Sequence, residues 1–107
     1  MLSTFARHIA AGISAVIAVA STHAQSPGVT ADTLVLGRIL PLTGVLAGES
    51  KIYAEGMDVL FDRINKAGGI NGRKIVVKNY DDAYAADKAA IAAKTALEQD
   101  QVLFLLG

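Results

Sequence analysis

The sequence predicts an α/β fold in which an open parallel sheet carries helices on both faces. Three short runs rich in apolar residues have the length of strands, and two longer segments with apolar residues at helical spacing separate them. No short turn joins one of these runs directly to the next, so each connection contains a helix and the strands run parallel. The order is strand, helix, strand, helix, strand, with right-handed crossovers.

The first strand is predicted at the run from Leu34 to Leu40, which is almost continuously apolar and suits a strand covered on both faces. Pro41 ends it, because proline has no N–H to offer a neighbouring strand. A loop over residues 41–48 follows, and the helical pattern begins near Ser50. A glycine-containing loop therefore lies at the carboxyl end of a central strand, where open α/β sheets bind ligands.

The first helix is predicted over residues 51–67, with one apolar stripe on an otherwise charged surface. The stripe consists of Tyr53, Met57, Leu60, Phe61 and Ile64. Gly56 costs this helix about 1 kcal/mol relative to alanine, which predicts close packing of the backbone at that position. Gly68 is the residue type that ends a helix in the left-handed conformation.

The remaining elements continue the alternation. A strand rich in β-branched residues is predicted over 74–80, and a polar turn over 81–84. The alanine-rich segment 85–99 is the second helix, whose small side chains allow it to lie close to the sheet. The apolar run 102–106 is the third strand.

The first 24 residues have the three parts of a secretory signal peptide. Arg7 and His8 give a basic start, residues 9–20 form a short apolar core, and Ala24 is a small residue at the expected cleavage position. The alternative is a membrane span, but that needs roughly 20 apolar residues, more than this core contains. We expect cleavage before Gln25 and a soluble product in the periplasm. We do not expect a lipoprotein, because no cysteine is present to carry the lipid.

Composition excludes several classes of function. The chain has ten basic and ten acidic residues and no basic run, so it has no electrostatic footprint for nucleic acid. After residue 24 it contains neither histidine nor cysteine. Serine–histidine triads, cysteine nucleophiles and His/Cys zinc sites cannot form there, so we expect no enzyme, no metal and no cofactor. The GGINGRK segment at 68–74 follows a helix and precedes a strand, the reverse of a phosphate-binding loop.

Two carboxylates, Asp81 and Asp82, stand together at the carboxyl end of the second predicted strand. Such a pair could hold a metal ion or act as a general base. No third cluster of oxygen ligands accompanies them in the sequence. Adjacent aspartates in a turn are more commonly solvated or accept hydrogen bonds from backbone N–H groups, and we favour that structural interpretation.

Several short motifs carry a resemblance to a known family. The two most specific are PLTG at 41–44 and AGGINGRKI at 67–75, and the others are GVT at 28–30, LG at 36–37, IN at 64–65 and YDD at 80–82. Together they resemble the beginning of the periplasmic binding proteins for branched-chain amino acids, the solute-binding subunits of ABC importers. The resemblance covers essentially all of the chain after the signal peptide.

The resemblance implies a type I periplasmic binding fold, in which two similar α/β lobes close over a small solute. Residues 25–107 would be the N-terminal part of the first lobe, truncated before most of the solute-binding loops. The first strand would lie between the second and the third. Glu49 or Ser50 stands where relatives place a residue that can face the solute side chain. One departure is at 85–86, where relatives have Asp-Pro to start the helix and this chain has two alanines.

Three functions remain open. The first is a receptor that captures a branched-chain or related amino acid, or a small amide or carboxylate, in the periplasm and delivers it to ABC permease subunits of the inner membrane. The second is an exported α/β enzyme whose catalytic residues lie after Gly107, and the third is the ligand-sensing domain of a membrane receptor. The resemblance and the lack of nucleophiles favour the first.

Overall fold

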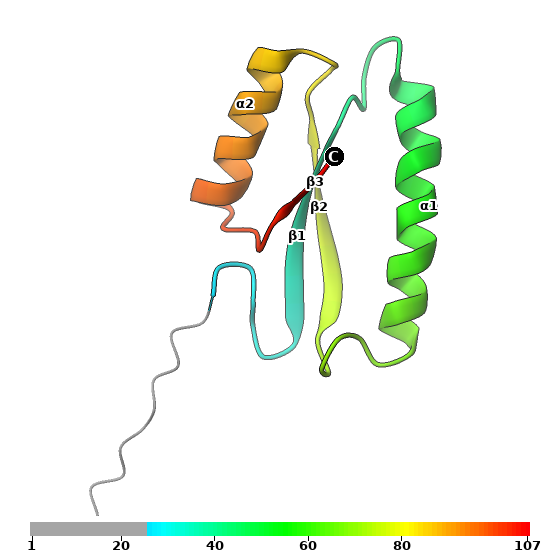
Figure 1. Cartoon of the computed structure of the whole chain (residues 1–107), viewed down its shortest axis with the longest axis vertical. Coiled ribbons are helices and arrows are strands. Elements are labelled where there is room, and N and C mark those ends of the chain that lie inside the picture. Colours follow the sequence, from blue (N-terminus) through cyan, green and yellow to red (C-terminus); the bar gives the residue numbers. More distant parts are fainter. Residues whose placement is uncertain (1–25) are drawn as a thin grey trace, which may run out of the picture.

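In a computed structural model of the chain, the described residues, 26–107, form a three-stranded parallel sheet between two helices (Figure 1). The predicted signal peptide and its cleavage point lie outside the described residues. The strands are β1 (Thr33–Leu40), β2 (Lys74–Asp81) and β3 (Leu105–Leu106), in the spatial order β2-β1-β3. The helices are α1 (Ala47–Lys66), α2 (Ala86–Lys94) and the π-helical continuation η1 (Thr95–Gln99). The predicted fold class and order of elements are confirmed.

The two faces of β1 bury different kinds of residue, because side chains alternate along a strand. Leu36, Arg38 and Leu40 are buried on the face toward α1. On the opposite face Gly37 leaves room for Ala96 of η1 and for Val102, which are 0% and 2% exposed. β1 is thus covered on both faces, as its apolar sequence predicted.

Close approach occurs at a different glycine from the one that the sequence suggested. A Cβ atom added at Gly37 would lie 2.8 Å from Leu105 Cδ2 and 3.1 Å from Val102 Cγ2. The same atom added at Gly56 would meet nothing within 4 Å, so the prediction of close packing in α1 is wrong. Glycine is therefore needed in the central strand, where it lets η1 and the segment before β3 pack against the sheet.

The start of α1 also differs from the prediction. The helix begins at Ala47, and Leu46 occupies the N-cap position without any side-chain capping bond. Because no Ser, Thr, Asp or Asn stands there, the sequence carries no start signal at this point. The chain turns instead at Gly44, whose φ is +84° and whose carbonyl accepts the Ala47 N–H at 3.2 Å.

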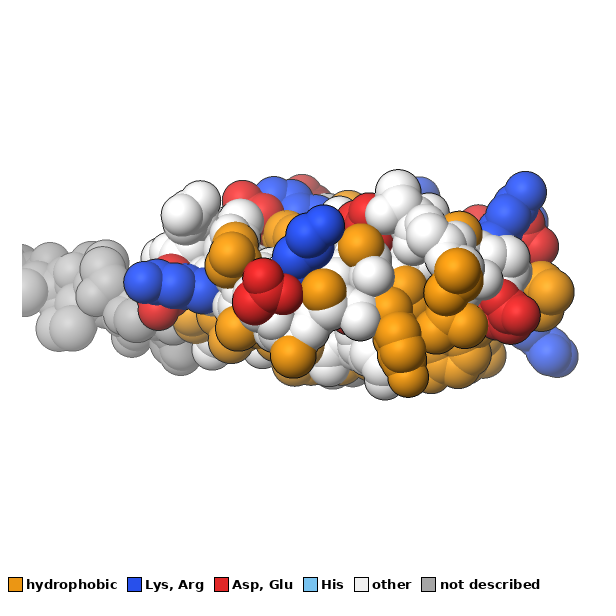
Figure 2. Space-filling view, turned by 90° about the horizontal axis from the view of Figure 1, so that it is seen from above, with side chains coloured by type: hydrophobic (Ala, Val, Ile, Leu, Met, Phe, Trp, Pro, Cys, Tyr) orange, Lys and Arg blue, Asp and Glu red, His pale blue; other side chains and the backbone are white. Residues whose placement is uncertain are grey.

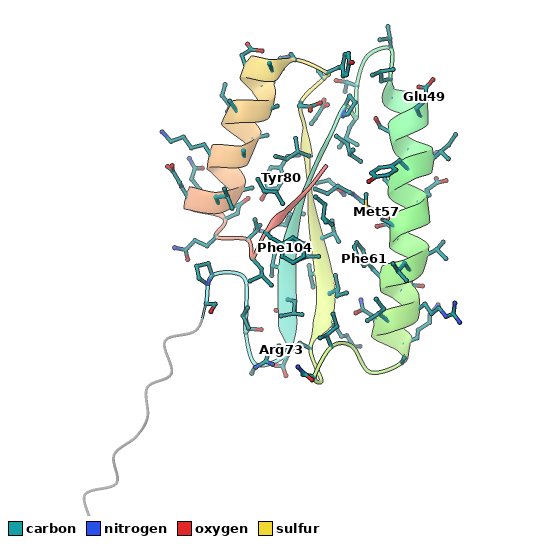
Figure 3. All side chains as sticks on the ribbon, viewed as in Figure 1. Glu49, Met57, Phe61, Arg73, Tyr80 and Phe104 are labelled. Carbon is teal, nitrogen blue, oxygen red and sulfur yellow. The ribbon has the colours of Figure 1, made fainter. Side chains whose placement is uncertain are left out.

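Only part of the predicted apolar stripe of α1 is packed. Met57 and Phe61 point toward the sheet and are half-buried (Figure 3). Tyr53 and Leu60 are 53% and 54% exposed. In a view of the loop end, hydrophobic side chains gather at the surface in the right half, on the side where α1 lies (Figure 2).

β3 is shorter than the apolar run that predicted it. The Val35 N–H donates to Gly28 O at 2.7 Å, so it is not used by the third strand. If the register that places Gly37 opposite Leu105 continued, the Val35 carbonyl would accept the Phe104 N–H. It accepts the Leu103 N–H instead, at 2.7 Å, so the pairing shifts by one residue here. This shift confines regular pairing to Leu105 and Leu106, although Val102 is buried as expected.

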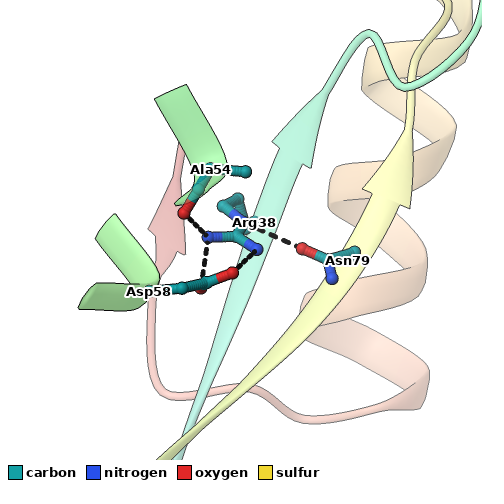
Figure 4. Close-up of polar contacts among 4 residues, drawn as sticks. All are labelled: Arg38, Ala54, Asp58 and Asn79. Carbon is teal, nitrogen blue, oxygen red and sulfur yellow. Dashed lines mark hydrogen bonds and ion pairs between the residues drawn. The ribbon is translucent and has the colours of Figure 1, made fainter. Parts of the chain in front are cut away.

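A buried arginine connects α1 to the sheet (Figure 4). Arg38 is 3% exposed. Its Nε donates to Asn79 Oδ1 of β2 at 2.8 Å, and its Nη1 donates to Ala54 O and Asp58 Oδ1 of α1 at 3.1 and 2.8 Å. Its Nη2 donates to Asp58 Oδ2 at 3.3 Å. Burying an unpaired charge is costly, so these bonds fix α1 over the sheet at this point.

Asn65 makes a second connection near the end of α1. Its amide donates to Ile75 O at 2.9 Å and accepts the Ile75 N–H at 2.7 Å. Because β2 lies at the edge of the described sheet, this side chain satisfies backbone groups that no strand pairs with.

No helix within residues 26–107 is long and apolar enough to span a membrane.

Asp58→Ala is expected to lower the free energy of unfolding by about 2 kcal/mol, because it removes the carboxylate that pairs with a buried guanidinium. Asp62→Ala is the matched control on the same helix, since among the described residues Asp62 pairs only with the exposed Lys66, at 2.8 Å. Its loss should cost less than about 0.5 kcal/mol. Urea unfolding of the two variants measures both values, and equal costs would contradict the role given to Arg38.

Candidate functional site

The candidate site lies at the carboxyl end of the sheet, where the β1–α1 loop, residues 41–46, runs beside the β2–α2 turn, residues 82–85 (Figure 1). The parallel pairing of β1 with β2 ends at Leu40 opposite Asp81, so both strands deliver their connections to the same edge. This is the position at which an open α/β sheet binds ligands.

Asp81 holds the β1–α1 loop. Its Oδ1 accepts the N–H groups of Leu42 and Thr43 at 2.8 and 3.3 Å, and its Oδ2 accepts the Thr43 hydroxyl at 2.6 Å. Oδ1 also accepts the Ala83 N–H at 2.9 Å, which is in the β2–α2 turn. The Thr43 hydroxyl and then the Ala83 N–H are the main groups that lower the pKa of this carboxyl, because hydrogen bonds to the charged form favour it.

Asp82 stabilises the turn that follows β2. Its Oδ1 accepts the Tyr84 N–H at 2.9 Å, and its backbone N–H donates to Leu40 O at 3.2 Å. Ala83 and Tyr84 both have left-handed backbones, with φ of 47° and 59°. Such conformations cost non-glycine residues energy, and the two carboxylates supply acceptors that hold them.

Both aspartates thus accept bonds from backbone N–H groups, as the favoured interpretation of the sequence had it. Within residues 26–107 no group of three or more Asp, Glu, His or Cys residues could hold a metal ion.

The absent Asp-Pro pair changes how α2 starts: the N-cap Ala85 is extended and forms no side-chain bond. The Ala85 N–H donates to Asp82 O at 2.8 Å, which closes the turn that leads into α2.

The two site residues predicted from the sequence lie in the first turn of α1. Glu49 is exposed and projects from this turn at the loop end of the molecule (Figure 3). Ser50 is 6% exposed, and its N–H donates to Leu46 O at 3.0 Å. No side chain caps α1, and within residues 26–107 the N–H groups of Gly48 and Glu49 have no hydrogen-bond acceptor, so these two groups and the positive end of the helix dipole are available to a negatively charged group.

An open groove of about 520 Å³ lies between the first half of α1 and the sheet. Arg38 and Asn79 form its floor, and Leu42, Ala47 and Gly48 bring the loop and the helix start to its rim. Glu49 and Ser50 are not among its lining residues. The side chains at the bottom of this groove are already hydrogen-bonded to one another, since Arg38 donates to Asn79 and Asp58. These contacts are structural.

A second groove, of about 390 Å³, lies on the other face between β2 and α2. Tyr80 lines it, and its hydroxyl donates to Asp100 Oδ2 at 2.5 Å. Partial burial and this bond raise the pKa of Tyr80 to about 12. The interaction ties β2 to the segment after η1, which makes it a structural contact.

Comparison with known proteins decides the family. A sequence profile described as "Periplasmic binding protein" matches residues 33–107, which contain the whole sheet and both helices. The chain belongs to this family. The family resemblance found in the sequence is therefore confirmed, and the fold is that of the type I periplasmic binding proteins.

The relatives include named amino-acid-binding proteins. The chain is 35% identical over 91 residues to Leu/Ile/Val-binding protein homolog 3 of Brucella melitensis, which covers 85% of this chain and 24% of the relative. It is 34% identical over 82 residues to the leucine-, isoleucine-, valine-, threonine- and alanine-binding protein of Pseudomonas aeruginosa, covering 77% and 22%. The chain thus spans about a quarter of the length of these periplasmic binding proteins.

Solved structures of periplasmic binding proteins agree with the fold. The branched-chain amino acid transporter substrate-binding protein LivJ from Streptococcus pneumoniae, in complex with isoleucine, has a TM-score of 0.67 and 29% identity over 71% of this chain and 22% of its own. The fatty acid ABC transporter substrate-binding protein from Thermomonospora curvata also has a TM-score of 0.67, with 32% identity over 76% of this chain and 20% of its own. Equal similarity to proteins named for different solutes means that this fold does not by itself identify the solute.

Sequence reasoning missed two features of the site. Arg38 was overlooked because it stands within an apolar strand, although a lone charge there signals a buried pair. The link from Asp81 to Thr43 joins residues 38 positions apart, and only the pairing of β1 with β2 brings them together.

Acidification should release the β1–α1 loop. The pKa of Asp81 is lowered from its ordinary value of 3.8, so its bonds stabilise the fold above that value and are lost as the pH falls through the lower, folded-state pKa. The amide resonances of Leu42, Thr43 and Ala83 should shift together in an acid NMR titration, with a midpoint below 3.8. A midpoint at or above this value would contradict the bonding described.

Proposed function

We propose that the chain forms the beginning of the first lobe of a solute-binding receptor of an ABC importer, and that it acts without catalysis. The observation that carries the proposal is the family match over residues 33–107, which spans every strand and helix of the described chain. Relatives about four times as long leave room for the remainder of this lobe and for a second one. Residues 25–107 then form one wall of the cleft between two lobes.

The proposed solute is a branched-chain or related amino acid, or a small amide or carboxylate. The names of the Brucella and Pseudomonas relatives and the isoleucine bound to LivJ support an aliphatic amino acid. The uncapped start of α1 supports the same class, because its N–H groups and dipole favour a carboxylate. The receptor would pass this solute to ABC permease subunits of the inner membrane.

The family places such receptors in the periplasm or outside the cell. For this chain we propose export by a signal peptide of residues 1–24 and release as a protein without a lipid anchor. The basic start, short apolar core and Ala24 support this route. N-terminal sequencing of the exported protein should begin at Gln25, and exported material that begins at Met1 would contradict it.

The proposed solute contacts are Glu49 and Ser50, in the first turn of α1. Replacing either by alanine in the complete gene product should change the affinity for an aliphatic amino acid by roughly tenfold or alter the order of preference among leucine, isoleucine and valine. Titration calorimetry with these three amino acids measures both effects.

Lys66→Ala is a suitable control, because Lys66 lies at the other end of the same helix, is exposed and, within residues 26–107, pairs only with the exposed Asp62, at 2.8 Å. It should bind as the unmodified protein does. Unchanged binding in the Glu49 and Ser50 variants would remove this turn from the site, and a gene product that binds no solute would contradict the proposed function.

A further inference from the structure

We propose that Asp81 is a positioning residue for the solute site, an inference that rests on the proposed function. Its carboxylate ties the β1–α1 loop to β2 and to the β2–α2 turn. It thereby sets where the first turn of α1, with Glu49 and Ser50, stands at the cleft. Asp81 itself need not touch the solute.

The loop depends on this one side chain. Within residues 26–107, the hydrogen bonds that connect residues 42–46 to another part of the fold all end on Asp81. The other bonds of the segment are local ones, from the Ala47 N–H to Gly44 and from the Ser50 N–H to Leu46. Val45 is 91% exposed, so side-chain burial does little to hold the loop at its tip.

Within residues 26–107, no hydrogen bond ties the first turn of α1 directly to the sheet, although Ser50 in this turn is buried. No side chain caps it, and the nearest bonds from the helix to the sheet are those of Arg38 to Ala54 and Asp58, at least one turn further along. Hydrogen bonds therefore restrain the position of Glu49 and Ser50 only through Arg38 on one side and the loop on the other. Removing the loop bonds leaves this turn held by the burial of Ser50 and by the more distant Arg38 bonds.

The two carboxylate oxygens of Asp81 accept different hydrogen bonds. A substitution can therefore remove the negative charge and still keep the bonds to the backbone. Oδ1 accepts all three backbone N–H groups, from Leu42, Thr43 and Ala83, whereas Oδ2 accepts only the Thr43 hydroxyl. Asparagine keeps an oxygen for the three N–H groups and places its NH₂ beside a hydroxyl that can also accept. Alanine removes all four bonds.

The test compares Asp81→Ala with Asp81→Asn in the complete gene product. Hydrogen exchange at the amides of Leu42 and Thr43 should accelerate at least roughly tenfold in the alanine variant, because their acceptor is gone. Affinity for L-isoleucine, used as the probe in calorimetry, should fall by a similar factor, and the asparagine variant should restore both to within roughly threefold of the wild type.

Asp82→Ala is the matched control, because Asp82 is the neighbouring aspartate and bonds to the β2–α2 turn alone through its side chain. It should accelerate exchange at Tyr84 and leave Leu42 and Thr43 as they are. The inference is overturned if Asp81→Ala leaves their exchange unchanged, or if exchange accelerates while isoleucine affinity stays the same. A wild type that binds neither an aliphatic amino acid nor a small amide or carboxylate would instead overturn the proposed function, and this inference with it.

Discussion

The structure depends on the pairing of a buried guanidinium in its central strand. β1 is covered on both faces, yet it carries Arg38 among its apolar residues. The charge is tolerated because α1 supplies a carbonyl and a carboxylate and β2 supplies an amide oxygen. One side chain thereby fixes a helix and two strands relative to one another. Since a buried charge without its partners is strongly destabilising, placements of α1 that break these bonds are strongly disfavoured.

The loop end of the sheet depends on a second polar residue in a different way. Asp81 is exposed, and its bonds are to backbone groups of two connections that are distant in the sequence. Arg38 holds the middle of α1, and Asp81 holds the loop that leads into it. The wall of the proposed cleft is therefore built from rigid strands and a loop that is fixed at its base and exposed at its tip, an arrangement suited to ligand binding.

The sequence predicted the parts of the fold that follow from local pattern. The apolar run of β1, the β-branched β2 and the alanine-rich α2 are recognisable from their local composition and length, so the α/β class and the order of elements could be predicted directly. The residues that govern the details have no local signature. Leu46 does not mark a helix start, Gly37 differs from Gly56 only in what packs against it, and Gly28 takes a bond from β1 that a longer β3 would need.

The central claim is that the β1–α1 loop and the first turn of α1 line a solute cleft. It is tested most directly by a crystal structure of the complete gene product with its solute bound. The account predicts solute atoms in contact with the first turn of α1, with the Arg38 and Asp81 bonds intact. A solute that touches neither the loop nor this turn, for example one held in the groove beside Tyr80, would contradict it.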